Sequence, residues 1–232
     1  MKMKIFSYPY MLWLIIFIVV PLLLVFLYAV TISENGNLQF TMENIKRFLN
    51  PNYLDVLWIS IKLALQTTAI TLILGYPIGM IIAKEKPSKR NIMVLLFVIP
   101  MWMNFLLRTY AWLTLLGKNG IINFIVTLLG FEPLNLLYDD GAVLLGMVYN
   151  FLPFMVLPIY SVIEKIDNSL IEAAEDLGAN KLNVFTKVIL PLSIPGIITG
   201  ITMVFMPAVS TFVISRLLGG GQYMLIGNLI EQ

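Results

Sequence analysis

Side chains that commonly perform catalysis or bind metals are scarce in this chain. It contains no histidine and no cysteine among its 232 residues. Zinc sites built from these residues, disulfides and histidine-dependent triads are therefore excluded. The formal net charge of +2 gives no basis for nucleic-acid binding. We expect no catalytic residues, no metal site and no nucleic-acid partner.

A few charged residues stand within or beside long apolar segments. Arg108 lies in the middle of one segment, where a charge is costly and marks a candidate functional residue. A structural arginine that pairs with backbone carbonyls, or one near the outer surface, is the alternative. Lys62 lies near the start of another segment and can extend its ammonium group towards water. No Asp or Glu is expected deep inside any of these segments.

The most informative polar stretch runs from Asp167 to Pro195, DNSLIEAAEDLGANKLNVFTKVILPLSIP. Ser169 and Glu172 are spaced as a capping box, which predicts a helix start. Apolar residues at helical spacing then give one face, and Gly178 stands where a left-handed glycine ends a helix. The residues of that face are Leu170, Ala173, Ala174 and Leu177.

A second short helix is predicted directly after this glycine. Asn180 is a suitable cap, and Pro191 is expected to end the helix. The predicted apolar face comprises Leu182, Phe185, Val188 and Ile189. Two interpretations of the helix pair stay open: it packs only against its own bundle, or it docks a partner protein through its small alanine face.

The composition defines the elements that must position these residues. Hydrophobic residues make up 59% of the chain and charged residues only 12%, which is typical of a polytopic membrane protein. A spanning helix needs about 20 mostly apolar residues. Five spans are predicted in one transmembrane domain over residues 1–232, at about 8–32, 56–83, 91–116, 142–163 and 194–217. The fold class is therefore an all-α polytopic helical bundle.

The distribution of lysine and arginine predicts the orientation. Nine of these residues fall in the N-terminus, the 84–91 loop and the 164–192 segment, against four on the alternate side. Because cytoplasmic loops carry an excess of positive charge, those three regions, including Lys2 and Lys4, are expected in the cytoplasm.

One motif resembles a known family. The segment from Glu172 to Pro191 resembles the EAA loop of binding-protein-dependent ABC importer permeases. The matching pattern is Glu172-Ala173-Ala174, three residues, Gly178, nine residues, Val188, one residue and Leu190-Pro191, although isoleucine is usual at the position of Val188. Further segments resemble the polyamine branch of that family: 74–84, 99–112, 151–179 and 224–228. The resemblance implies a MetI-like permease bundle, with a sixth helix expected beyond Gln232.

The resemblance also implies an assembly. The chain would be one subunit of a permease heterodimer, bound to an ATPase dimer and to an extracytoplasmic binding protein for spermidine or putrescine. It would lie among lipids in the bacterial inner membrane and bind no cofactor itself. It would couple ATP hydrolysis to alternating access through six residues: Glu172, Ala173, Ala174, Gly178, Leu190 and Pro191. ATP and magnesium would be used by the ATPase, since the chain contains no GxxxxGK[ST] phosphate loop.

If the solute is a polyamine, aromatic rings can hold its ammonium groups by cation–π contact. The candidate pathway residues are Trp102, Asn104, Arg108, Tyr149 and Asn150. Direct contact between the Arg108 guanidinium and a polyamine is disfavoured because the two charges repel. The aromatic members can equally be interface anchors or packing residues.

Two other functions stay open. The chain could be an ABC permease for another small solute, because a fold does not fix a substrate. It could also be an ATP-independent secondary transporter, which the EAA segment and the absence of buried carboxylates disfavour. A membrane enzyme would have almost no chemical groups to use.

Overall fold

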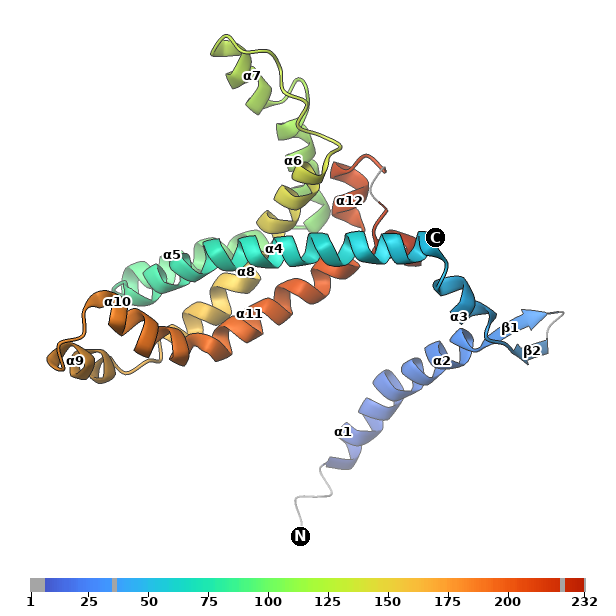
Figure 1. Ribbon diagram of the computed structural model, residues 1–232, viewed down its shortest axis with the longest axis horizontal. Helices are drawn as coiled ribbons and strands as arrows, with labels where there is room; N and C mark the ends of the chain where they lie inside the picture. The colour runs from blue at the N-terminus through green and yellow to red at the C-terminus, as the bar shows by residue number, and fades with distance from the viewer. Residues whose placement is uncertain (1–6, 35–36, 222–223, 232) are drawn as a thin grey trace. The chain divides into compact units, whose positions relative to one another are not determined.

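The computed structural model describes residues 7–34, 37–221 and 224–231, and these are predominantly helical (Figure 1). Lys2 and Lys4, which contributed to the predicted orientation, lie outside the described residues. The sequence indicated one transmembrane domain, whereas the structure distinguishes two compact units, Met1–Asp55 and Val56–Gln232. Each unit is described by itself.

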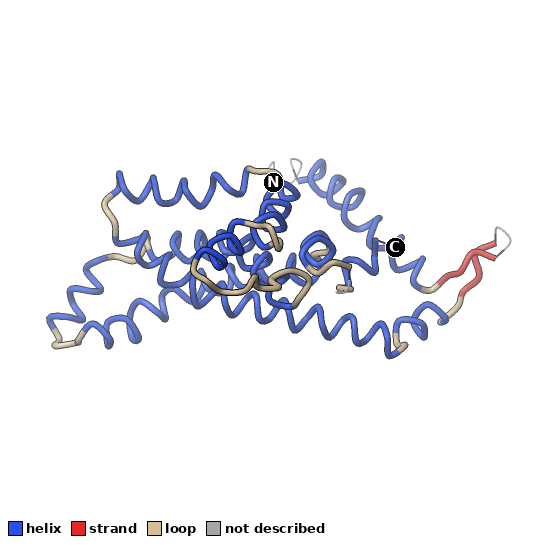
Figure 2. The backbone as a smooth tube through the Cα atoms, turned by 90° about the horizontal axis from the view of Figure 1, so that it is seen from above, coloured by secondary structure: helices blue, strands red, loops and turns tan. Residues whose placement is uncertain are grey.

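The first unit contains an apolar helix followed by a β-hairpin, which Figure 2 shows in red. The helix is predicted to reach residue 32 but ends at Ala29, because Thr31 already pairs with Phe40 across the hairpin. The Thr31 hydroxyl donates to the carbonyl of Leu27 at 2.6 Å and satisfies a helix-end group. The elements are α1 Ser7–Leu14, the π-helix η2 Ile15–Val19, α2 Val20–Ala29, β1 Thr31–Glu34, β2 Asn37–Phe40 and α3 Glu43–Phe48.

The second unit is a helical bundle whose first helix, α4, begins a few residues before the boundary between the units. Its elements are α4 Pro51–Lys84, α5 Pro87–Trp102, α6 Phe105–Leu116, α7 Ile121–Leu128, α8 Asp140–Ile163, α9 Asn168–Asp176, α10 Lys181–Val184, the π-helix η3 Phe185–Ile189, α11 Leu190–Ser210, α12 Val213–Leu218 and α13 Ile226–Glu231. Helices α8 and α11 pack against each other, and Gly75 and Gly79 of α4 lie against α8.

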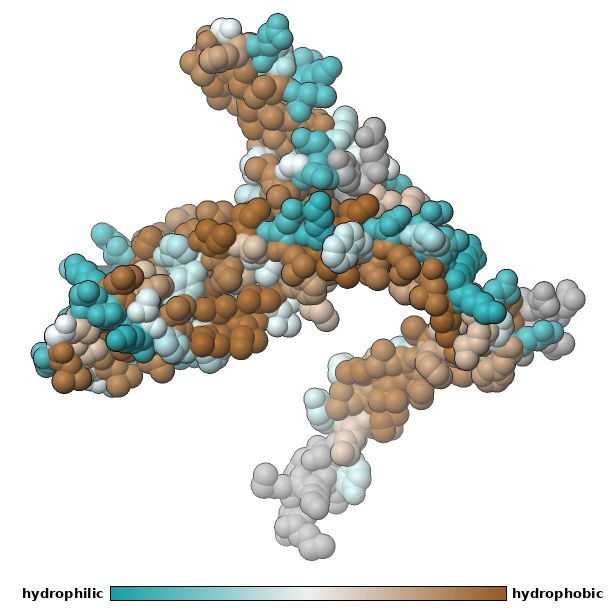
Figure 3. Space-filling view, viewed as in Figure 1, coloured by the Kyte–Doolittle hydropathy of each residue, from teal (hydrophilic) through white to brown (hydrophobic). Residues whose placement is uncertain are grey.

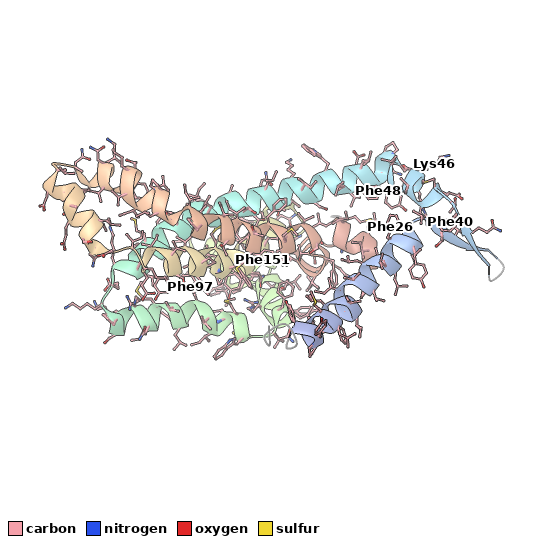
Figure 4. The ribbon with its side chains drawn as sticks, turned by 90° about the horizontal axis from the view of Figure 1, so that it is seen from below. Phe26, Phe40, Lys46, Phe48, Phe97 and Phe151 are labelled. Carbon is pink, nitrogen blue, oxygen red and sulfur yellow. The ribbon has the colours of Figure 1, made fainter. Side chains whose placement is uncertain are left out.

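Helix α8 is the centre of this bundle, and Phe151 lies among its buried side chains (Figure 4). Helix α11 approaches α8 through a stripe of small or short buried residues, as membrane helices do when backbones pack closely. A Cβ at Gly196 would lie 2.9 Å from the carbonyl oxygen of Pro158, so only glycine allows this approach. The stripe comprises Ser193, Gly196, Gly200, Val204 and Ala208.

Within the described residues, five helical segments are long and apolar enough to cross a membrane. This is the number of spans that the sequence predicted. Their bounds differ from the predicted ones at several ends. They are Tyr8–Ala29, Pro51–Lys84, Phe105–Leu128, Asp140–Ile163 and Lys181–Ser210.

The largest difference concerns the predicted span at 91–116. The chain leaves the helical conformation at Met103, where ψ is 147°, so α5 and α6 are separate helices. The side chain of Asn104 accepts hydrogen bonds from the backbone N–H groups of Leu106 and Leu107 at 2.8 and 3.4 Å. Asn104 is thus the N-cap of α6, and its polar side chain is the physical reason for a new helix start inside an apolar stretch.

The prediction that Pro191 ends a helix is wrong. The chain is continuously helical from Lys181 to Ser210, through η3 and into α11. The N–H of Leu190 bonds to the carbonyl of Phe185, five residues back, so the regular ladder is already interrupted beside the proline. The predicted fifth span, 194–217, is likewise divided, because Thr211 is extended and α12 begins anew at Val213.

Candidate functional site

The helix α9 carries the EAA residues and starts differently from the prediction. Asp167, rather than Ser169, is the N-cap: its carboxylate accepts from the backbone N–H of Ser169 at 3.0 Å. This bond favours the ionised form and lowers the pKa of Asp167, whose side chain is exposed. The predicted capping box is therefore wrong, because an earlier acceptor reaches the free N–H groups first.

The glycine corner after α9 is confirmed. Gly178 has φ of +83°, the left-handed region that glycine adopts without cost. The N–H of Gly178 donates to the carbonyl of Glu175 at 2.9 Å, and the N–H of Ala179 donates to the carbonyl of Ala174 at 3.0 Å. These two bonds form a Schellman motif, which ends α9 sharply. The predicted cap at Asn180 is also confirmed, because its side chain accepts from the N–H of Asn183 at 2.8 Å.

The predicted apolar face of α9 is largely uncovered within the described chain. Leu170, Ala173 and Leu177 are exposed, with 90% of the Leu177 surface accessible, and Ala174 is half-buried. Hydrophilic residues surround them at this end of the bundle, as Figure 3 shows. An exposed apolar face within a polar rim is typical of a surface that binds another protein.

The segment is firmly joined to the bundle at its other end. In α10 and η3, Val184 and Ile189 are buried. The Tyr76 hydroxyl of α4 forms a 2.9 Å hydrogen bond with the Ser193 hydroxyl, and its ring meets Phe185 edge-on at 5.8 Å. Because α10, η3 and α11 form one helix, a displacement of α9 and the glycine corner can pass directly into α11.

An ion pair marks the junction between α8 and α9. Arg90 in α5 lies 3.0 Å from Glu164, the C-cap of α8, and both side chains are partly exposed. The pair borders a cavity of about 340 Å³ that also reaches Asn168, Ile171 and Ile189. Sequence reasoning missed Arg90, Glu164 and Tyr76 as site residues, since only the fold brings their distant positions together.

The pathway candidates do not lie in one place. Trp102 and Asn104 are exposed at the α5–α6 junction, and Tyr149 stacks edge-on against Trp112 at 5.3 Å. Tyr149 borders an apolar groove formed by α4, α6 and α8. Asn150 is buried, and its Nδ2 donates to the carbonyl of Gly146 at 2.8 Å.

Arg108 is also buried, with 8% of its surface exposed. Its charge lies 6.0 Å from the centre of the Phe105 ring. The alternative in which Arg108 pairs with backbone carbonyls is not met at Nε and Nη1, which are buried and have no hydrogen-bond partner among the described residues.

Comparisons with known proteins agree with this architecture. The family model described as "Binding-protein-dependent transport system inner membrane component" matches residues 75–232. The chain is 42% identical to the spermidine/putrescine transport system permease protein PotB of Haemophilus influenzae, covering 94% of this chain and 78% of that protein. It is 39% identical to PotB of Escherichia coli K12, covering 94% of this chain and 82% of that protein.

A bacterial alginate ABC transporter, solved in complex with an alginate-pentasaccharide-bound periplasmic protein, has the same fold. The TM-score is 0.71 over 98% of this chain and 81% of that one, at 17% identity. The apolar helices and the relatives indicate a multi-pass protein of the inner membrane, a transport component rather than an enzyme. The chain belongs to the family of binding-protein-dependent transport system inner membrane components.

Proposed function

We propose that this chain is the permease subunit of an ATP-driven importer for polyamines, spermidine or putrescine. It pairs with a second permease subunit, and the two together bind an ATPase dimer on the cytoplasmic side and a polyamine-binding protein on the outer side. ATP and magnesium are bound by the ATPase. The observation that supports a polyamine as the solute is the similarity to two PotB proteins, at 42% and 39% identity over most of the chain.

The coupling role of α9 rests on its geometry. Glu172, Ala173 and Ala174 lie in a short helix with an exposed face, and Gly178 sets its end. Leu190 and Pro191 lie where η3 continues into α11, so they transmit rather than receive the movement. ATP-driven closure of the ATPase dimer would carry α9 with it and switch the pathway between its inward and outward openings.

The proposed orientation places the N-terminus, the α4–α5 connection and α9 in the cytoplasm. Lys84 ends α4, Lys86 lies in the connection, and Lys89 and Arg90 lie in the first turn of α5. Such clusters are retained on the cytoplasmic side during insertion. This arrangement puts α9 on the side where the ATPase is found.

The transported cation is held mainly by neutral and aromatic groups on this subunit. The accessible candidates are Trp102 and Asn104 at the α5–α6 junction and, at a separate place, Tyr149. Asn150 is buried, and Arg108 is not expected to contact the solute. Aromatic faces and amide oxygens can replace part of the water around an ammonium group. Carboxylates for a polycation come from the binding protein and the second permease.

The test is uptake of labelled spermidine into liposomes that contain the complete complex with the full-length chain. The binding protein is supplied outside, and ATP or a non-hydrolysable analogue is enclosed. Uptake that needs both hydrolysable ATP and the binding protein, and that excess putrescine reduces, is the expected result. Uptake of another solute alone would discard the polyamine assignment, and uptake indifferent to ATP would contradict the ATP-driven mechanism.

A further inference from the structure

The chain between α6 and α8 forms a projecting arm that contains α7 (Figure 1). Asn123 in α7 is buried and joins the two ends of this arm. Its Nδ2 donates to the carbonyls of Gly117 and Leu134 at 3.1 and 3.0 Å, and its Oδ1 accepts from the N–H of Leu134 at 2.7 Å. These bonds hold the segment that returns to α8 against the Asn123 face of α7. Because the buried amide is satisfied on both sides, the arm has a defined structure.

The opposite face of α7 is apolar and uncovered within the described chain. Its large side chains recur at helical spacing, and 75% of the Leu128 surface is accessible. The turn after α7 adds two more exposed side chains, Leu129 and Phe131. The exposed residues of the helix face are Ile121, Phe124, Ile125 and Leu128. A soluble surface rarely leaves so many large apolar side chains together in water, so this face indicates contact with a membrane or another protein.

Polar residues flank α7 on both sides in the sequence. Lys118 and Asn119 precede the helix, Glu132 and Asn135 follow it, and all four are exposed. Figure 3 shows the arm brown along one side and teal along the other. An apolar helix face accompanied by charged and polar residues on the other side is typical of a helix that lies in the boundary between membrane and water.

The break between α6 and α7 indicates where that boundary lies. Length and composition alone would allow one crossing over Phe105–Leu128. The helix, however, stops at Leu116 and restarts at Ile121, and the exposed Lys118 and Asn119 lie in the break. Lipid-exposed irregular backbone does not occur within the hydrocarbon, so the break marks the edge of the membrane. Helix α7, whose 8 residues measure about 12 Å, then lies along this edge.

The composition of the apolar face distinguishes lipid from a protein partner. Membrane helices pack closely on one another through small residues, as α11 does against α8. The exposed face of α7 has only large aliphatic and aromatic side chains, which suit the boundary of the acyl chains. Leu106, Leu107 and Tyr110 of the preceding α6 are exposed in the same way, so a lipid-covered surface would continue from α6 into α7.

We propose that α7 is an in-plane membrane anchor, whose apolar face enters the bilayer near the lipid headgroups on the side opposite α9. Because α8 runs from Asp140 to Ile163 and leads into α9, the arm that precedes α8 lies at the other end of that crossing. With the proposed orientation, this side is the outer leaflet. The anchor fixes the depth of α6 in the membrane. The leaflet rests on the proposed orientation, whereas the in-plane placement does not.

The depth of α7 in the membrane tests the proposal. The chain has no cysteine, so Ile121→Cys, Phe124→Cys and Leu128→Cys each provide one thiol for a fluorophore. Each variant is assembled into the complete complex with cysteine-free partners in liposomes. Lipids spin-labelled near the headgroup or at the end of the acyl chain quench from the two depths, and iodide quenches from water. At all three positions, quenching by the headgroup-proximal label is expected to be at least about threefold stronger than quenching by the deep label or by iodide.

Asn119→Cys and Asn135→Cys are the matched controls, because these exposed polar residues flank α7 in the same arm. Both should be quenched strongly by iodide and weakly by either lipid. An α7 that continued a spanning helix would place Ile121 and Leu128 about 10 Å apart in depth. Such a gradient between the two positions would overturn the in-plane placement.

The remaining outcomes identify other occupants of the apolar face. Protection of all three positions from lipid and iodide alike would mean that the second permease covers α7. Strong quenching by iodide would mean that the face meets water or the binding protein, and either result would overturn the inference. The depths do not depend on the solute. Shallow lipid quenching in a complex that fails to import spermidine would therefore support this inference and contradict the proposed function.

Discussion

At the scale of single residues, Gly178 has the clearest requirement. Its φ of +83° costs a residue with a side chain roughly 1–2 kcal/mol, yet a Cβ there would meet nothing within 4 Å. The cost of a side chain is therefore confined to this backbone strain, and the open space is available to a bound partner. This combination explains why a substitution can disturb docking without disturbing the fold.

Gly178→Asp is expected to reduce ATP-dependent uptake at least about tenfold, because a charged side chain would enter the docked surface without its own partner. Insertion into the membrane should be unchanged. Gly130→Asp is the matched control, since Gly130 has φ of +85° and equally open surroundings. Equal losses in both variants would show that backbone strain, and not docking, is responsible.

Asp167 gives a second expectation at this scale. Its pKa is lowered by the N–H of Ser169, so the cap contributes fully above the ordinary pKa of 3.8 and is lost as pH falls through the lower folded value. Between pH 5 and 8 the cap should therefore be constant. Asp167→Ala should accelerate amide hydrogen exchange in α9 at pH 7, whereas Asp167→Asn should not, because asparagine also caps. Equal exchange in all three proteins would contradict the assigned cap.

Residue patterns predicted some of these features and missed others for physical reasons. Gly178 and Asn180 were predictable because left-handed glycines and N-caps depend on neighbouring residues alone. Ser169 and Asp167 are both good caps, and only the backbone geometry shows which one reaches the free N–H. The partners of Tyr76 and Arg90 are distant in sequence, so their contacts depend on how the helices pack.

At the scale of elements, the two π-helical turns have the same arrangement. In η2 the N–H of Val20 bonds to the carbonyl of Ile15, and in η3 the N–H of Leu190 bonds to the carbonyl of Phe185. Pro21 and Pro191 follow directly. Each wide turn admits a proline without ending the helix. Local sequence rules treat such a proline as the end of a helix.

The ion pair of Arg90 and Glu164 gives a prediction about the α8–α9 junction. Arg90→Glu or Glu164→Arg alone places like charges together and should lower the solute imported per ATP hydrolysed, because the end of α8, which leads into α9, is no longer held against α5. Making both changes restores opposite charges. The double variant should recover to within about twofold of the original ratio.

Lys89→Glu is the control for this exchange, because Lys89 is exposed beside Arg90 and forms no ion pair in the described structure. It should leave the coupling ratio unchanged. A double variant that performs no better than the worse single variant would show that the two residues act independently.

At the scale of the whole molecule, the predicted helical class and the number of spans are confirmed, but several helix bounds are not as predicted. Apolar composition over about 20 residues is a strong signal for a span. It does not reveal where a polar cap such as Asn104 restarts a helix. It also does not reveal that the helix of α10 continues into α11.

The binding of α9 to the ATPase subunit is tested most directly by a crosslink. The chain has no cysteine, so Ala173→Cys introduces a unique thiol on the exposed face of α9. A thiol-attached photocrosslinker at that position in the assembled complex should join this chain to the ATPase subunit. The same label at Phe124→Cys, on exposed α7, should not. A product with the ATPase from Phe124 and none from Ala173 would show that α9 is not the helix that binds the ATPase.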